Sequence, residues 1–313
     1  MSMGITHAYL PTTWIKGVPN NIYNPLSSTD AFKEDEQSAR HIRFEPTINF
    51  FALTQQSQHM YGQCSVYGLG LQSTLFMDNL LPGLYSTIAT AVLTKHDRVH
   101  GHSSKIRHTT SSSLSDTTIA LGWKALSTPR LYLSGYLFGI IPAPHHSLRN
   151  SSNTVPWIGL DNHFVGGAGL ETGMRLCGTA RHHLDLLTDA QVLFLTDRQA
   201  QAWVKKSQRW VLHPIKIHAH ELYKLQPTLI YQWSHFISDL GIQYFYMPEP
   251  AYTDMNGIHK HLDADRWCSL MYNIGATISS STADFYCTVG AQLTGRNQSF
   301  DMWGSNLKCC LRF

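Results

Sequence analysis

The sequence predicts an all-β protein that forms a closed, up-and-down antiparallel β-barrel of about 12 strands, with about 14 strands as the alternative. Three observations support this prediction. Apolar and polar residues alternate along successive segments, the connections between these segments alternate in length, and charged residues are scarce. We expect the barrel to occupy residues 41–313, preceded by an irregular segment at 1–40.

Residues 1–40 show no alternation of apolar and polar residues. They contain Pro11, Pro19 and Pro25, which interrupt regular structure, and the charged run 33–36. We therefore expect a leader, or a plug inside the barrel, in place of a strand. The segments expected to form strands are 41–54, 63–77, 84–95, 116–126, 130–142, 163–176, 183–195, 223–234, 236–248, 266–279, 283–295 and 300–313.

Alternation with a period of two indicates a strand whose two faces meet different surroundings. In segment 183–195, leucines at even positions lie on one face, whereas Asp185 and Asp189 lie on the other. A shift of one residue would exchange the two faces, so an alternating segment fixes which face points to lipid. Segments 63–77 and 84–95 alternate poorly, and their facing stays open.

The connections between these segments are long and short in turn. The longer ones are 55–62, 96–115, 143–162, 196–222 and 249–265, and the last odd connection, 296–299, is the exception. A membrane barrel has this rhythm because short turns lie at one end and long loops at the other. A soluble β-sandwich gives no reason for long loops to fall on one side. Only a closed sheet can cross hydrocarbon, where unpaired backbone groups find no partner.

The composition argues against several other classes of protein. Only 14% of the 313 residues are charged, against roughly 25% in soluble domains, and the net charge of +3 is too small to indicate a nucleic-acid partner. No apolar run reaches the roughly 18 residues of a membrane helix. The six cysteines show no C-x-x-C spacing for zinc or for a disulfide framework. The N-terminus has no readable export signal, which counts against export unless the signal was removed.

The final segment, 300–313, carries a resemblance to a known family. Its apolar face consists of Trp303, Leu307, Cys309, Leu311 and Phe313, and its polar face of Asn306, Lys308 and Arg312. A last strand that alternates in this way and ends on Phe resembles the bacterial outer-membrane β-barrel (porin-like) proteins; Ser305 departs from the pattern, and Cys309 is an uncommon choice. The resemblance implies an integral outer-membrane protein in a lipid bilayer. It also implies that the assembly signal formed by Leu307, Cys309, Leu311 and Phe313 is recognised by barrel-assembly machinery.

The polar faces are expected to line the interior of the barrel. The charged residues on them are Arg43, Glu45, Lys124, Glu171, Arg175, Asp185, Asp189, Lys224, Asp239, Lys308 and Arg312. Because their signs are mixed, they predict a passive pore or channel for small polar solutes, or a narrow barrel partly plugged by residues 1–40. No cofactor is expected.

Two alternatives belong to other functional classes. Some outer-membrane barrels are lipid hydrolases that use His and Ser, and His145-His146-Ser147 lies near Asn150 and Asn153. Such a dyad belongs on a strand that faces lipid, whereas these residues lie in a polar connection. The other alternative is a β-structured surface binding protein without a pore.

Histidines are abundant in the long connections and include three H-x-H pairs. In extended backbone each pair would present two imidazoles on one side, which could begin a Zn²⁺ or Cu²⁺ site at the outer mouth. The alternative is that these are ordinary polar loop residues. The pairs are His100 with His102, His218 with His220, and His259 with His261.

Two small features concern the predicted strands themselves. Gly166, Gly167 and Gly169 lie in an alternating strand and are expected to let the barrel bend or let a plug approach. Pro227 lies inside another predicted strand. Its missing N–H group predicts a bulge or a strand end there.

Overall fold

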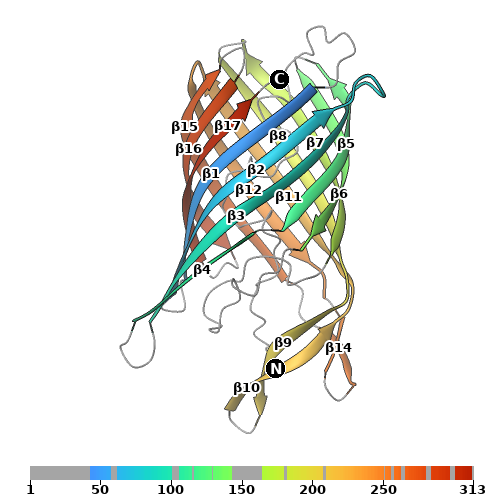
Figure 1. Ribbon diagram of the computed structural model, residues 1–313, viewed down its shortest axis with the longest axis vertical. Helices are drawn as coiled ribbons and strands as arrows, with labels where there is room; N and C mark the ends of the chain where they lie inside the picture. Colours follow the sequence, from blue (N-terminus) through green and yellow to red (C-terminus); the bar gives the residue numbers. More distant parts are fainter. Residues whose placement is uncertain are drawn as a thin grey trace.

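The structure is a computed structural model, and almost all of the residues that it describes lie in β-strands (Figure 1). Among these residues, no helix is long and apolar enough to cross a membrane. The expected irregular segment at 1–40 lies outside them. The described residues are 43–57, 62–100, 106–114, 116–128, 130–142, 164–179, 182–206, 209–249, 251–254, 257–261, 265–279, 283–296 and 300–311.

The main sheet contains 13 strands, and each neighbouring pair in it is antiparallel. The predicted all-β, antiparallel, up-and-down architecture is therefore confirmed. Its strands are β1 (Arg43–Ser57), β2 (Gly62–Phe76), β3 (Leu84–His100), β4 (Ile106–Leu114), β5 (Thr117–Ser127), β6 (Leu131–Ile141), β7 (Val165–Gly178), β8 (His182–Leu195), β11 (His220–Trp233), β12 (Phe236–Met247), β15 (Asp265–Ser279), β16 (Ala283–Arg296) and β17 (Phe300–Leu311).

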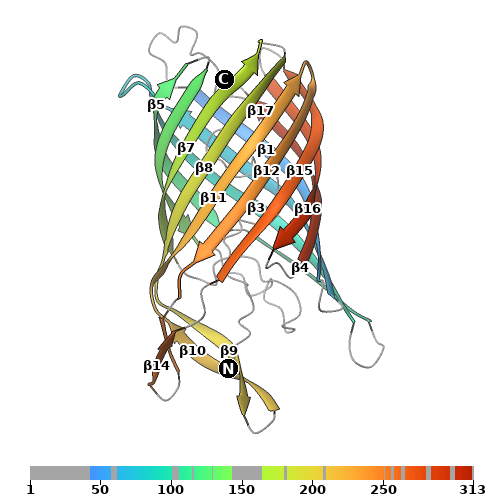
Figure 2. The same ribbon diagram turned by 180° about the vertical axis from the view of Figure 1, so that it is seen from behind.

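The strands of the main sheet wrap around a common axis (Figures 1 and 2). Strand β17 pairs with β1, β1 pairs with β2, and β2 pairs with β3 along its whole length. Strand β3 then pairs with both β4 and β5, which follow one another along the chain. The count of 13 exceeds the expected 12 because the predicted connection 96–115 contains β4.

A second sheet has four strands: β9 (Arg198–Lys206), β10 (Arg209–Ile217), β13 (Ala251–Thr253) and β14 (His259–His261). It is formed by two segments that the sequence assigned to long connections, 196–222 and 249–265. Alternation in these strands is weak, because β9 sets alanines against glutamines and β13 and β14 have three residues each. The alternative of 14 strands takes two more strands from residues 1–40 or from 196–222. The pair that 196–222 forms, β9 and β10, belongs to this second sheet, and residues 1–40 lie outside the described part.

The two ends of the barrel differ, as the rhythm of connections predicted. The strand ends at Arg43 and Leu311 lie on the same end as the short turns 77–83 and 234–235. The second sheet lies at the opposite end, which we call the long-connection end (Figures 1 and 2).

The outer face of the main sheet is apolar and exposed. In β8, odd positions are more buried and even positions less so, up to the exposed Phe194. In β3, whose facing the sequence left open, Tyr85 and Ala89 are buried whereas Ile88 and Val92 are exposed. Large apolar side chains are thus exposed along the sheet, which is the reverse of a water-soluble protein and suits a lipid-facing wall.

Pro227 does not end its strand or shift its register. Strand β11 runs from His220 through Pro227 to Trp233, so the expectation of a bulge or strand end is wrong. Pairing with β8 continues at Pro227, opposite Thr188. Pairing with β12 is interrupted at 226–227 and resumes in the same register. A proline lacks only one N–H group, so only one side of the strand loses pairs.

Candidate functional site

The inner face of β6, β7, β8 and β11 carries a buried polar network centred on Asp189. Both carboxylate oxygens of Asp189 accept hydrogen bonds: Oδ1 from the Tyr136 hydroxyl at 2.7 Å, and Oδ2 from Gln191 Nε2 at 2.8 Å and Lys224 Nζ at 2.9 Å. Gln191 Nε2 also donates to the Tyr136 hydroxyl at 2.6 Å. We call these four residues the Asp189 cluster. Three donors, one of which is the Lys224 cation, offset the cost of burying the carboxylate.

A second buried carboxylate lies directly beside this cluster. Glu171 of β7 is the antiparallel partner of Asp189, and both side chains are buried. Two like charges in directly opposite positions destabilise a sheet unless donors compensate them. The Tyr132 hydroxyl donates to Glu171 Oε2 at 3.2 Å, and Lys224 supplies positive charge next to Asp189.

Towards the short-turn end, Asp185 forms a further charge pair. Arg175 Nε donates to Asp185 Oδ1 at 3.0 Å, and His183 Nε2 lies 3.4 Å from Asp185 Oδ2. Arg175 comes from β7, whereas Asp185 and His183 come from β8. The carboxylates on this wall are therefore accompanied by cations, so no single charge sign dominates the described part of the inner face.

Three aromatic side chains lie over glycines of the neighbouring strand. A Cβ added to Gly122 would overlap the Tyr85 ring, and one added to Gly169 would overlap the Tyr136 ring. Lying flat in this way, Tyr136 reaches across β7 to Asp189. Tyr85 reaches in the same way across β5 to Ser134 of β6, with 3.0 Å between the two hydroxyl oxygens.

The third of these aromatics is Phe138, which lies over Gly167 of β7. The expectation that glycines at 166–169 serve bending or a plug is thus replaced, for Gly167 and Gly169, by a specific role under these rings. Sequence alone did not pair each glycine with its aromatic because that pairing depends on the register between β6 and β7.

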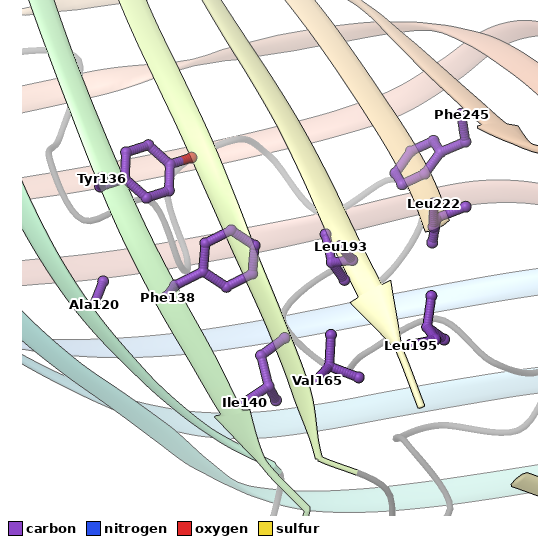
Figure 3. Close-up of a cluster of buried hydrophobic side chains, with 9 residues drawn as sticks. All are labelled: Ala120, Tyr136, Phe138, Ile140, Val165, Leu193, Leu195, Leu222 and Phe245. Atoms are coloured by element: carbon purple, nitrogen blue, oxygen red, sulfur yellow. The ribbon is translucent and has the colours of Figure 1, made fainter. Parts of the chain in front are cut away.

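Next to the polar network, towards the long-connection end, the inner face becomes apolar. Phe138, Gly167 and Leu193 lie side by side in register, as do Ile140, Val165 and Leu195. We call the buried apolar group the apolar belt (Figure 3). Its members are Ala120, Tyr136, Phe138, Ile140, Val165, Leu193, Leu195, Leu222 and Phe245.

The belt corrects the expectation of a polar inner face throughout. The signal was present in 130–142, where Phe138 and Ile140 alternate with Leu137 and Ile141, so both faces are apolar at one end of the segment. In a membrane wall one of these faces, with Leu137 and Ile141, is exposed towards lipid, and the other, with Phe138 and Ile140, is buried inside the barrel. The inner wall therefore changes from charged to apolar along the barrel axis.

The structure places the remaining predicted pore-lining residues as follows. Lys124 is half-buried, with its Nζ 5.0 Å from the centre of the Phe76 ring, and Asp239 of β12 is half-buried opposite Asn273. Arg43, Glu45 and Lys308 lie on strands of the main sheet, but their side chains and the whole of Arg312 lie outside the described part. Of the predicted assembly signal, Leu307 is exposed and Cys309 half-buried; Phe313 and the Leu311 side chain also lie outside it.

The histidines of the H-x-H pairs that the structure describes are placed as follows. Within the described residues, no group of three or more His, Cys, Asp or Glu side chains is placed to hold a metal ion. His220 Nδ1 lies 2.8 Å from the backbone oxygen of His218, so this nitrogen of His220 is engaged by the main chain of its partner. His259 and His261 are both exposed on β14. His102 and the side chain of His100 lie outside the described residues.

Asp197, between β8 and β9, accepts hydrogen bonds at the long-connection end. Lys216 Nζ lies 2.7 Å from Asp197 Oδ2, and the backbone N–H of Ala219 donates to Oδ1 at 2.8 Å. The hydrogen bond from Lys216 is the largest of the causes that lower the pKa of Asp197, ahead of the bond from Ala219.

The fold is similar to that of solved outer-membrane proteins. An outer-membrane channel from Pseudomonas putida F1 aligns over 90% of this chain and 99% of its own, with 13% identity and a TM-score of 0.58. The transport unit of the autotransporter AIDA-I from Escherichia coli aligns over 91% and 94%, with 8% identity and a TM-score of 0.46. The Pseudomonas putida toluene transporter TodX aligns over 93% and 91%, with 12% identity and a TM-score of 0.42.

No protein-family model matches the sequence, and the comparison with curated proteins found no match. The first likeness, which covers nearly the whole of both chains, is one of fold. Together with the exposed apolar outer face, it shows that this chain has the fold of a bacterial outer-membrane β-barrel, as the sequence predicted.

Proposed function

We propose that the chain is a closed 12-stranded barrel in the outer membrane that acts as a passive channel for small solutes. The pairings of β17 with β1 and of β2 with β3 support closure, with β4 and β5 counted as one interrupted strand. One observation carries the functional proposal: the wall is apolar on its exposed face and carries charge pairs on its buried face. The lipid bilayer is accordingly a partner of the outer face, and barrel-assembly machinery is the proposed partner for its insertion.

The composition of the inner face suggests which solutes pass. The charge pairs Lys224–Asp189 and Arg175–Asp185 balance one another, which favours little preference for anions or cations. The apolar belt follows the charged part along the axis, so a permeating molecule meets both environments in turn. We propose small polar solutes that also carry an apolar part.

The wall and a plug have separate roles in conduction. Asp189 and Glu171 are buried in the wall, where Tyr132, Tyr136 and Lys224 bond to them. We propose that residues 1–40 occupy part of the lumen as a plug and thereby limit conduction. No catalytic role is proposed, because the candidate hydrolase residues His145 and Ser147 lie outside the described part.

The test is conductance in planar lipid bilayers. We expect wild-type protein to give small, infrequent channels with weak charge selectivity, and a chain lacking residues 1–40 to give larger ones. Lys224→Met should shift the selectivity towards cations, because Asp189 then keeps its charge without its counter-ion. Val192→Met, on the outer face of the same wall, is the control. Bilayers that stay silent with folded wild type and with the shortened chain would contradict the channel.

A further inference from the structure

Two histidines from different connections converge on one hydroxyl group at the long-connection end. His218 Nε2 lies 2.7 Å from Thr253 Oγ1, and His259 Nδ1 lies 2.9 Å from the same oxygen. His218 follows β10, Thr253 ends β13, and His259 begins β14. The two imidazole nitrogens therefore approach one oxygen from the two neighbours of β13, with His218 next to β10 and His259 on β14.

The backbone fixes this convergence. Thr253 is the antiparallel partner of both Lys216 and His259, and the His218 N–H donates to the backbone oxygen of Ala251 at 2.8 Å. His218 and His259 are thus brought together by pairing between segments that lie about 40 residues apart in the sequence. A hydroxyl has one hydrogen and two acceptor lone pairs, so it can donate to one ring and accept from the other. In that arrangement one nitrogen presents its lone pair to this position.

We propose that His218 and His259 form a binding site for one late first-row divalent ion, of the Zn²⁺ or Cu²⁺ class. With metal–nitrogen bonds of about 2.0–2.1 Å and ring centres about 1.1 Å further out, two imidazoles on a tetrahedral ion have centres about 5 Å apart. The ring centres of His218 and His259 are 5.6 Å apart. A small closing movement brings both nitrogens within bonding distance, and the Thr253 hydroxyl and water complete the coordination.

The surrounding charges suit a cation at this place. Asp197 Oδ1 lies 3.9 Å from His218 Nδ1, on the side of the ring away from Thr253. A carboxylate behind a ligating imidazole orients the ring and raises its basicity. The two nearby lysines are each next to a carboxylate: Lys216 lies 2.7 Å from Asp197, and Lys260 lies 3.5 Å from Asp254. The site is therefore not dominated by positive charge.

This site differs from the H-x-H pairs that the sequence suggested. It takes one histidine from each of two pairs, and His220 and His261 take no part. A bound ion would link the β9–β10 segment to the β13–β14 segment and so stabilise the second sheet at the long-connection end. The inference stands independently of conduction, since the ligands lie outside the membrane-spanning strands.

The experiment measures Zn²⁺ binding to the full chain in detergent at pH 7.5, by competition with a chromophoric chelator. We expect one ion per chain, with affinity reduced at least tenfold by His218→Ala and by His259→Ala. His261→Ala, on the same short strand as His259, is the matched control and should bind as wild type. Binding by histidines elsewhere in the chain is common to all four proteins and cancels in the comparison.

A second measurement separates loss of the ion-binding ligands from loss of the fold. His259 is exposed, so its removal should leave the fold intact, as far-UV circular dichroism can check. Cu²⁺ bound to wild type should give an electron paramagnetic resonance spectrum with two nitrogen ligands, reduced to one in His259→Ala. Wild-type affinity in both variants would overturn the proposal. An equal loss in His261→Ala would overturn it too, by assigning the ion to the H-x-H pair.

Discussion

At Gly169 one added methyl group should damage the inner wall by displacing the Tyr136 ring. A Cβ on Gly169 would overlap the Tyr136 ring, which lies against this glycine on its way to Asp189. Overpacking of this kind costs about 1–3 kcal/mol, and a lost hydrogen bond to a charged group costs about 1.5–3 kcal/mol. Alanine also lowers the conformational entropy of the unfolded chain, which offsets about 0.4–1 kcal/mol of this loss of stability. We therefore expect Gly169→Ala to lower the free energy of unfolding by about 1.5–5.5 kcal/mol.

The control lies three residues away on the same strand. A Cβ on Gly166 would meet no described atom within 4 Å, so Gly166→Ala should be neutral or slightly stabilising. The assay is equilibrium unfolding by guanidinium of protein inserted into lipid vesicles, followed by tryptophan fluorescence. A third variant isolates the cause: in a Tyr136→Ala background, Gly169→Ala should cost almost nothing. Equal stability of Gly169→Ala and Gly166→Ala, or a cost that persists without the Tyr136 ring, would refute the reasoning.

Three further predictions test the charges and the lipid face. Lys224→Met leaves Asp189 buried without its cation and should cost about 3–5 kcal/mol in the same unfolding assay, most of which Asp189→Asn added to it should restore. Leu137→Arg places a cation on the exposed face of β6 and should cost about 2–4 kcal/mol, whereas Leu80→Arg, in the turn before β3, should cost about 0–1 kcal/mol; equal costs would contradict the membrane position. In Lys216→Met the pKa of Asp197, measured by NMR titration, should rise towards its ordinary value, because the main donor to Asp197 is gone. In the wild type, Asp197 is charged and bonded to Lys216 above its lowered pKa, and both the charge and the bond are lost as the pH falls through that pKa.

The strands of the main sheet were predictable because the two sides of the wall differ. Lipid on one side and a lumen on the other impose a period of two, which located 183–195 and 236–248 within a residue or two of β8 and β12. The second sheet also has one buried face, since Ile215 and Ile217 of β10 are buried whereas Lys216 between them is exposed. Its alternation is weaker: β9 sets alanines against glutamines, and β13 and β14 have three residues each. Small side chains and short runs distinguish a strand poorly from a polar loop.

The candidate site was predictable only at the level of single residues. The alternation of apolar and polar residues placed Asp185, Asp189 and Glu171 on the same face of the wall. Which donor meets which carboxylate depends on the register between neighbouring strands, such as β7 and β8. Tyr136 reaches Asp189 only because Gly169 lies between them. A contact between β6 and β8 depends on the register of β6 with β7, on the register of β7 with β8, and on a glycine in β7 at the crossing point. The pattern within a single segment does not contain that information.

The same glycines connect the stability of the wall to the width of the lumen. A tyrosine on the inner face of a barrel would ordinarily extend towards the axis, where it narrows the passage. Gly122 and Gly169 let Tyr85 and Tyr136 lie along the wall, so that their hydroxyls bond to neighbouring strands rather than to solutes. Bulk at these positions should therefore act twice, by breaking the bonds to Ser134 and Asp189 and by turning two rings into the passage. A substitution such as Gly122→Ala should then reduce single-channel conductance together with stability, whereas Lys224→Met, which adds no bulk, should lower stability and change selectivity without reducing conductance.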